Sequence, residues 1–297
     1  MKTRILGRTG LKVSVIGLGT WQLGGEWGKA YTQDEADAIF DAAAAQGINL
    51  VDTAECYGDH RSEALLGDYL ARRDRGRWII ATKFGHRFHA FMKRTDVFDP
   101  AGVREQLEAS LRALRTDVID LYQFHSGPDA ASSNPALWEM LAEQKRAGRI
   151  RHLGISIRSK GSPVQAREAL AYGAEVLQVV YNRLDRRPET DVFPHAERDH
   201  LGLLARIPLA SGFLARAYAP GTTFPPNDVR STWPSEKVEE QIREAARVRE
   251  TEVPPGIPMA AWALAWCLRT PHVHCVIPGC KDPKQVETNA RAAELAV

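Results

Sequence analysis

Residues 48–83 read INLVDTAECYGDHRSEALLGDYLARRDRGRWIIATK, and this stretch decides the fold. It begins with an apolar run at residues 48–51 and ends with a second one at residues 78–82, and both runs are typical of buried strands. Between them, residues 61–73 carry apolar side chains at helical spacing. A strand, a helix and a strand in this order predict two parallel strands joined by a right-handed crossover.

The alternation of strands and helices continues to the end of the sequence. Further strands are expected at residues 13–18, 118–124, 150–157, 176–181, 203–207 and 273–277. Further helices are expected at residues 32–46, 101–114, 135–147, 163–172, 191–199, 235–249, 258–269 and 283–296. Eight strands separated by helices predict an α/β fold, a single (β/α)8 TIM-barrel domain over residues 1–297, since such barrels take about 250 residues. An open, doubly wound sheet is the alternative.

Three further segments are expected around this barrel. Residues 4–7 and 11–13, separated by a turn, predict an N-terminal β-hairpin that serves as an additional lid. Residues 84–99 and 210–234 are too long for plain turns and are expected to be functional lids or disordered segments. Both long loops leave the strand ends at which barrel enzymes place their active sites.

The composition is that of an ordinary packed protein. Lys and Arg number 39 against 37 Asp and Glu, a balance too even for binding to a phosphate backbone, so no nucleic-acid partner is expected. The first residues lack the apolar core of a signal peptide, and no stretch is apolar for long enough to span a bilayer. The four cysteines include no CxxC pair. We therefore expect a cytoplasmic protein with reduced cysteines, no membrane partner and no metal.

Four polar residues are the candidates for catalysis. Asp52, Lys83 and His125 each follow an apolar run, and Tyr57 lies five residues after Asp52. Parallel strands would bring the first three to one end of the barrel, where buried charges are costly unless they are paired or used. Taken alone, Lys83 and Asp52 are also compatible with a purely structural ion pair.

The four side chains together fit the reduction of a carbonyl group. A lysine ammonium favours the phenolate and lowers the pKa of a neighbouring tyrosine, and a carboxylate keeps that lysine charged. Tyr57 could then act as a general acid towards a developing alkoxide, with His125 orienting the substrate oxygen. Side chains cannot supply hydride, so a nicotinamide cofactor is expected, although Gly17 and Gly19 form only part of a dinucleotide fingerprint.

Several motifs resemble those of the aldo-keto reductases. They are residues 51–58 (VDTAECYG), residues 17–21 (GLGTW), the strand ends at Lys83 and His125, and Ile277-Pro278-Gly279 with Asn289 downstream. The motifs follow the order and spacing of that family over nearly the whole chain. The resemblance implies a (β/α)8 barrel that binds NADPH across the C-terminal face of its strands and acts on a small-molecule carbonyl substrate.

The resemblance also implies which residues form the site. The catalytic residues would be Asp52, Tyr57, Lys83 and His125. The cofactor would contact Gly19, Thr20, Trp21, Asp52, Ser156, Gln178, Arg206, Pro208, Leu209, Ser211, Gly212, Leu214, Ile277, Pro278, Gly279, Cys280, Lys281, Gln285 and Asn289. Ser156 and Gln178 match the positions that hold the carboxamide, and residues 208–214 match the loop that wraps the pyrophosphate. The substrate would lie among Trp21, Trp27, Tyr57 and His125, although the two tryptophans are equally compatible with simple packing of their loop.

The sequence departs from the family pattern at three places. Ile157 stands where asparagine is common, and Arg206 stands where a tyrosine often stacks on the nicotinamide. Gly279 and Gln285 are neutral, which leaves Lys281 as the cation for a 2′-phosphate. We expect NADPH, because no acidic residue opposes a phosphate there, and NADH remains the alternative.

Two other functions are compatible with parts of the sequence. A cofactor-binding regulatory subunit or redox sensor with slow turnover is the main alternative. A metal-dependent barrel hydrolase is disfavoured because the first strand offers no His-x-His pair. A rim that favours anionic or polyhydroxyl substrates is one interpretation of the basic residues Arg87, Lys93, Arg94, Arg158 and Lys160, and ordinary surface charge is the other.

Overall fold

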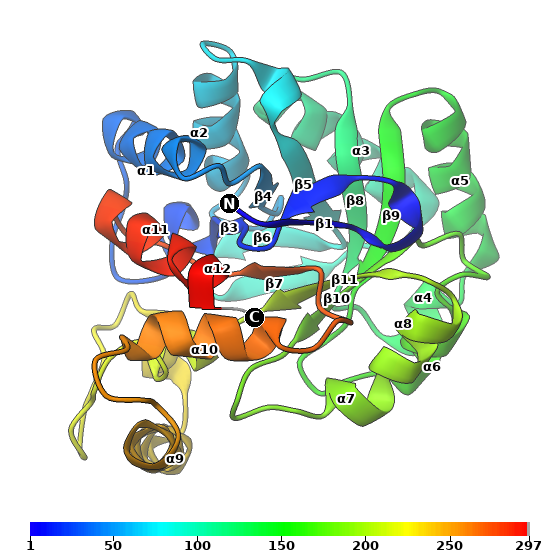
Figure 1. Ribbon diagram of the computed structural model, residues 1–297. Coiled ribbons are helices and arrows are strands. Elements are labelled where there is room, and N and C mark those ends of the chain that lie inside the picture. Colours follow the sequence, from blue (N-terminus) through cyan, green and yellow to red (C-terminus); the bar gives the residue numbers. More distant parts are fainter. Residues whose placement is uncertain (296–297) are drawn as a thin grey trace.

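The computed structural model describes residues 1–295, and eight parallel strands surround its centre (Figure 1). They are β3 (Leu18–Gly19), β4 (Leu50–Asp52), β5 (Ile79–Phe84), β8 (Ile119–His125), β9 (Ile150–Ser156), β10 (Val176–Val180), β11 (Gly202–Arg206) and β12 (Cys275–Ile277). The strands pair in chain order, and the parallel bridges Ile16–Val276 and Gly19–Gly279 join the first strand to the last. The predicted (β/α)8 barrel is confirmed, and the open sheet is wrong.

Helices follow the strands around the outside of the barrel. They are α1 (Gln33–Ala45), α2 (Arg61–Leu70), α3 (Pro100–Ala113), α4 (Asp129–Ser132), α5 (Pro135–Arg146), α6 (Pro163–Glu168), α7 (Pro188–Asp191), α8 (Phe193–Arg198), α9 (Ser235–Thr251), α10 (Met259–Leu268), α11 (Pro283–Ala290) and α12 (Ala292–Leu295). Proline occupies the first turn of many of them, where its missing N–H costs nothing. At α1, Thr32 and Glu35 form a capping box.

Two predicted helices are divided into shorter ones, and two others end early, at Leu70 rather than residue 73 and at Glu168 rather than residue 172. The helix expected at residues 191–199 is replaced by two short ones, α7 and α8, because Pro188 and Pro194 each start a new turn. The helix expected at residues 283–296 is divided at Arg291 into α11 and α12. Its predicted last residue, Ala296, lies outside the described residues.

The predicted N-terminal hairpin is present as β1 (Thr3–Ile5) and β2 (Lys12–Ser14). It closes the end of the barrel at which the strands begin and so serves there as the predicted additional lid (Figure 1). It lies at this end because Leu6 and Val13 are apolar and share a buried cluster with residues near the strand starts, namely Leu50, Ala81, Leu121, Val176, Leu204 and Cys275. The strand expected at residues 13–18 is wrong, because Val13 pairs with Arg4 in the hairpin and the barrel strand β3 begins only at Leu18.

The long segment after β5 is ordered rather than a loop. It forms a second antiparallel hairpin, β6 (His86–Ala90) and β7 (Lys93–Asp96), whose turn places Met92 in the left-handed region (φ 55°). The hairpin leaves the C-terminal end of β5, the same strand end that carries Lys83. It is therefore placed to wall the mouth of the barrel.

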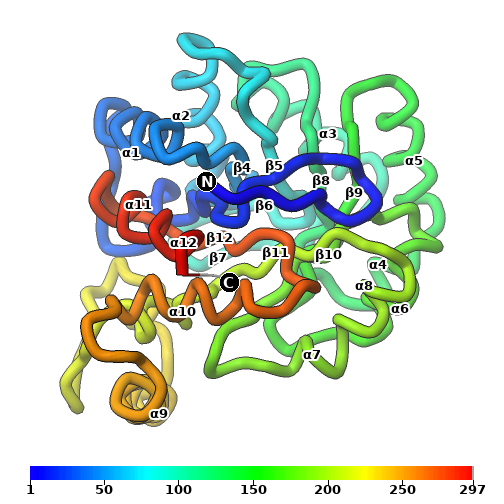
Figure 2. Tube along the Cα trace, in the orientation of Figure 1, coloured from blue at the N-terminus to red at the C-terminus, as the bar shows by residue number. Residues whose placement is uncertain are grey.

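The second long segment follows β11 and contains two short 3-10 helices, η4 (Ala210–Gly212) and η5 (Val229–Thr232). It packs beside α9 and α10, and Figure 2 shows this group projecting from one side of the barrel. Its apolar cluster includes Phe213, Ile242 and Trp262. The segment then reaches back to the loop after β3, where the Val229 N–H donates to the Glu26 carbonyl (3.0 Å). Among residues 1–295, no helix combines the length and hydrophobicity needed to cross a membrane.

Candidate active site

A cavity of about 790 Å³ opens at the C-terminal ends of the strands. Its wall includes most of the residues that the sequence predicts for the cofactor: Gly19, Thr20, Trp21, Asp52, Arg206, Pro208, Leu209, Ser211, Gly212, Ile277, Pro278, Gly279, Lys281, Gln285 and Asn289. Tyr57, His125 and Trp27 also line it. Four predicted cofactor contacts, Ser156, Gln178, Leu214 and Cys280, are buried and do not form part of the wall.

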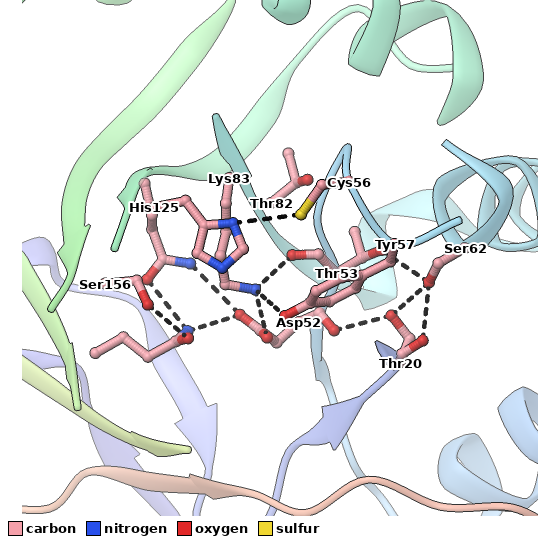
Figure 3. Close-up of polar contacts among 12 residues, drawn as sticks. Thr20, Asp52, Thr53, Cys56, Tyr57, Ser62, Thr82, Lys83, His125 and Ser156 are labelled. Atoms are coloured by element: carbon pink, nitrogen blue, oxygen red, sulfur yellow. Dashed lines mark hydrogen bonds and ion pairs between the residues drawn. The ribbon is translucent and has the colours of Figure 1, made fainter. Parts of the chain in front are cut away.

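The structure brings the four candidate catalytic residues together (Figure 3). The Lys83 ammonium donates to Asp52 Oδ2 (2.8 Å), to the Tyr57 hydroxyl (3.2 Å) and to the carbonyl of Thr53 (2.6 Å). The His125 ring lies beside the Tyr57 ring, with centroids 6.1 Å apart and an interplanar angle of 81°. Lys83 is completely buried and Asp52 nearly so. Carboxylate, ammonium and phenol therefore form one hydrogen-bonded chain that ends at the cavity.

Two side-chain amides hold the second oxygen of the Asp52 carboxylate. Its Oδ1 accepts from Gln178 Nε2 (2.7 Å) and from Gln123 Nε2 (3.4 Å), and the hydroxyl of Ser156 donates to Gln178 Oε1 (3.2 Å). Ser156 and Gln178 therefore help to hold Asp52 in place in this structure, because their polar groups point into the barrel core. The sequence does not indicate this role, because it depends on the relative positions of side chains from three strands.

Burial dominates the pKa of Tyr57. It raises the pKa of the phenol to about 12, although the nearby Lys83 ammonium acts in the opposite direction. The sequence correctly predicts the direction of the lysine effect, but the expected net lowering of the pKa is wrong because the partial removal of the phenol from solvent outweighs the ammonium. For Lys83, burial lowers the pKa, yet the Asp52 carboxylate and the Tyr57 phenol outweigh it and the pKa is raised. Tyr57 is thus protonated and Lys83 charged at neutral pH.

His125 is a neutral imidazole. Burial, followed by the charges of His86 and Lys83, holds its pKa well below the usual value. Its Nδ1 lies 3.7 Å from the thiol sulfur of Cys56, whose pKa is raised well above its usual value by burial. The carboxyl group of Glu55 is buried as well, and burial raises its pKa to about 8. The groups near Nδ1 of His125 are therefore mainly uncharged.

Two glycines allow the loop that carries Tyr57 to pack against the loop after β3. A Cβ on Gly24 would lie 2.6 Å from the backbone carbon of Tyr57. Gly58 has a positive φ of 69°, and a Cβ there would lie 2.3 Å from the Gly24 carbonyl oxygen. Neither position has room for a side chain, so this contact fixes the depth at which Tyr57 enters the cavity.

Aromatic rings form the wall beside Tyr57. The Trp21 ring stacks near that of Tyr57 (5.9 Å, 21°) and meets the Trp27 ring edge-on (5.2 Å, 90°). The Trp21 indole N–H donates to Glu26 Oε2 (2.7 Å), which also pairs with Arg94 of the β6–β7 hairpin. Arg94 lines the cavity as a partly buried, paired cation rather than as part of a surface rim. The importance of Glu26 could not be seen in the sequence, because it depends on how two loops meet.

The end of the cavity at Lys281 contains more cations than the sequence suggests. Lys281 donates to the carbonyl of Trp27 (2.9 Å), and Arg216, Arg230 and Lys284 line the same cavity. The expectation that no acidic residue lies there is wrong. Asp282 also lines the wall, where its carboxylate accepts the N–H of Gln285 (2.8 Å) as the N-cap of α11.

Five of the predicted cofactor residues form hydrogen bonds with one another. Asn289 donates to the sulfur of Cys280 (3.3 Å), which fixes the segment after β12 against α11. In the segment after β11, the N–H groups of Gly212 and Leu214 both donate to the carbonyl of Leu209 (2.9 and 3.1 Å). These two N–H groups stabilise the turn itself.

Comparisons with known proteins agree with this geometry. The family model described as "Aldo/keto reductase family" matches residues 15–297. The uncharacterized oxidoreductase YqkF of Bacillus subtilis (strain 168) is 34% identical over 297 residues, covering 99% of this chain and 91% of that protein. The aldo-keto reductase YhdN of the same organism is 31% identical over 290 residues, covering 94% and 85%.

Solved structures give the same result. The aldo-keto reductase AKR11C1 from Bacillus halodurans, in its holo form, superposes with a TM-score of 0.83 at 32% identity, covering 99% of this chain and 91% of that one. The glycerol dehydrogenase AKR11B4 from Gluconobacter oxydans gives a TM-score of 0.79 at 30% identity, covering 98% and 89%.

Proposed function

The chain belongs to the aldo/keto reductase family and is an NAD(P)H-dependent oxidoreductase, and on this premise we propose that it reduces aldehydes or ketones with NADPH, using Tyr57 as the general acid. One observation supports this proposal most strongly. The Tyr57 hydroxyl lies on the cavity wall, within hydrogen-bond distance of the fully buried ammonium of Lys83. A phenol so placed can give up its proton and leave a phenolate that the ammonium stabilises.

Each of the four residues has a role in this proposal. The residues of the cavity wall would hold a nicotinamide cofactor, which would supply the hydride. Tyr57 donates its proton to the carbonyl oxygen, and Lys83 holds the resulting negative charge. Asp52 keeps Lys83 charged and in place. His125, being neutral, donates a hydrogen bond that orients the carbonyl oxygen towards Tyr57.

The residues on the cavity wall fit a dinucleotide with a 2′-phosphate. A cavity of about 790 Å³ falls within the range of ligand sites, about 300–1,000 Å³. A Cβ on Gly279 would lie 2.1 Å from the Gln22 amide, so the glycine makes room for the Gln22 side chain on the cavity wall. Gln22 Oε1 and Arg206 Nε are buried and have no hydrogen-bond partner in the part of the chain that the structure describes. Arg216 and Lys284 add two exposed cations to Lys281, which favours NADPH over NADH.

Titration of intrinsic fluorescence with NADPH and with NADH tests the choice of cofactor. We expect tighter binding of NADPH. Replacing both Arg216 and Lys284 by alanine should weaken NADPH binding about tenfold, because two phosphate contacts are lost, and should leave NADH binding nearly unchanged. Arg112→Ala, at a cation outside the cavity, is the matched control. Equal affinity for both cofactors in the wild-type protein would contradict the NADPH assignment.

A regulatory subunit or redox sensor with slow turnover is the second candidate. The observation that favours it is the pKa of Tyr57, about 12, which makes the phenol a weak acid in the protein alone. Steady-state oxidation of NADPH with a panel of aldehydes and ketones separates the two functions. A reductase turns over repeatedly with at least one carbonyl, whereas a sensor binds the cofactor and oxidises it at most once.

A further inference from the structure

The thiol of Cys56 contacts the active-site imidazole directly. Its sulfur lies 3.7 Å from His125 Nδ1, and the side chain is almost fully buried on the cavity wall. Among residues 1–295, this contact is the only hydrogen bond that the His125 ring makes. Figure 3 shows the second ring nitrogen on the side of the Lys83 ammonium and the Tyr57 hydroxyl. The two ring nitrogens of His125 therefore face different groups.

A neutral imidazole carries one proton, so it has two possible forms. In one form the Cys56 S–H donates to Nδ1 and the ring proton is on Nε2. In the other form, Nδ1–H points at the sulfur, which is a weak acceptor, and Nε2 has no proton to donate. Burial keeps both groups uncharged, since the pKa of the thiol is raised and that of the imidazole is lowered. The first form pairs a donor with a good acceptor.

We propose that Cys56 is a positioning residue that donates its S–H to His125 Nδ1 and so fixes the ring proton on Nε2. The proton on Nε2 then faces the phenol and the ammonium, on the side where a carbonyl oxygen must lie to receive the proton of Tyr57. The catalytic use of this Nε2 proton rests on the proposed carbonyl reduction. The position of the proton on the ring can be measured without any turnover.

Glu55 is the competing partner for the same nitrogen. One of its carboxyl oxygens lies within 4.8 Å of both the thiol sulfur and a ring nitrogen of His125. Its Oε1 already accepts the backbone N–H of His86 (3.0 Å), whereas Oε2 is buried and has no hydrogen-bond partner among residues 1–295. Within the same residues, the thiol sulfur of Cys56 lies within hydrogen-bond distance of Nδ1 and Glu55 does not, so we assign this role to Cys56.

Nitrogen-15 NMR of protein labelled at histidine tests the proposal. His125→Gln identifies the resonances of this ring. In the wild-type protein at neutral pH we expect a proton on Nε2 and a hydrogen-bonded, unprotonated Nδ1. In Cys56→Ala the Nδ1 resonance should move to the position of a nitrogen without a donor, whereas Cys56→Ser and Glu55→Gln should keep it. A proton on Nδ1 in the wild type, or an Nδ1 shift in Glu55→Gln but not in Cys56→Ala, would overturn the assignment.

Kinetics give an independent measure of the same effect. We expect Cys56→Ala to lower kcat for carbonyl reduction about fivefold, the equivalent of one neutral hydrogen bond, with little change in KM. Cys56→Ser should recover kcat to within about twofold, because its hydroxyl is also a donor. The Kd for NADPH should stay the same in both variants, which excludes misfolding as the cause. Equal kcat in Cys56→Ala and the wild type would contradict the proposal, whereas absence of any carbonyl reduction, with the expected NMR result, would contradict only the proposed function.

Discussion

At the scale of single residues, the site depends on one ion pair that is almost completely shielded from solvent. Lys83 and Asp52 are both buried, and the ammonium is within 2.8 Å of the carboxylate. A buried pair of this kind adds little to stability compared with apolar residues, but removal of one partner leaves the other charge unpaired. The pair is therefore better explained by its contact with Tyr57 than by stability.

Replacement of Lys83 tests this account. Lys83→Met should lower the free energy of unfolding by about 3–5 kcal/mol, because it leaves Asp52 buried and unpaired. The double variant Asp52→Asn/Lys83→Met should recover at least half of that loss and still lack activity. Urea denaturation monitored by circular dichroism measures both. A single variant as stable as the wild type would show that Asp52 is not charged in the folded protein.

Glu55 makes stability depend on pH. Burial raises its pKa from 4.5 to about 8, so the folded protein keeps a proton that the unfolded chain loses above pH 4.5. Its contribution to stability is therefore complete below pH 4.5 and is lost as the pH rises towards 8. We expect the free energy of unfolding of the wild type to fall across this window, relative to that of Glu55→Gln, by at most about 5 kcal/mol. Parallel curves for the two proteins would show that Glu55 is not buried as a neutral acid.

At the scale of elements, three segments outside the barrel sheet contact one another and form the mouth of the barrel. The β6–β7 hairpin contributes Arg94, the loop after β3 contributes Glu26, and the segment after β11 pairs with that loop through Val229. Glu26 also holds the indole of Trp21, which stacks beside Tyr57. The buried Glu26 carboxylate therefore connects the hairpin to the wall of the site.

Release of this contact should loosen the hairpin without unfolding the barrel. Arg94→Met leaves Glu26 without its cation, so we expect faster amide hydrogen exchange over residues 86–96 and a higher KM for the carbonyl substrate. Arg87→Met is the matched control on the same hairpin, because its ion pair with Glu105 is exposed (57% and 75%) and contributes little. The account fails if both variants exchange at the same rate as the wild type.

At the scale of the whole molecule, the barrel explains which parts of the site were predictable. Lys83 and His125 end strands of a parallel sheet, so their convergence follows from the pattern of apolar runs alone. The β6–β7 hairpin is rich in charged side chains and lacks such a pattern, which is why the sequence indicated only a long loop. The net pKa of Tyr57 and the contact between Cys56 and His125 depend on burial and loop packing, which no local pattern encodes.

Tyr57→Phe tests the central claim most directly, because it removes one hydroxyl and keeps the ring that packs beside Trp21. The measurement is steady-state oxidation of NADPH with the best carbonyl substrate, together with fluorescence titration of the cofactor. We predict that turnover falls at least about a hundredfold, the contribution of a general acid, while the Kd for NADPH stays within about twofold of the wild type. Reduction of the carbonyl at the wild-type rate by Tyr57→Phe would contradict the account.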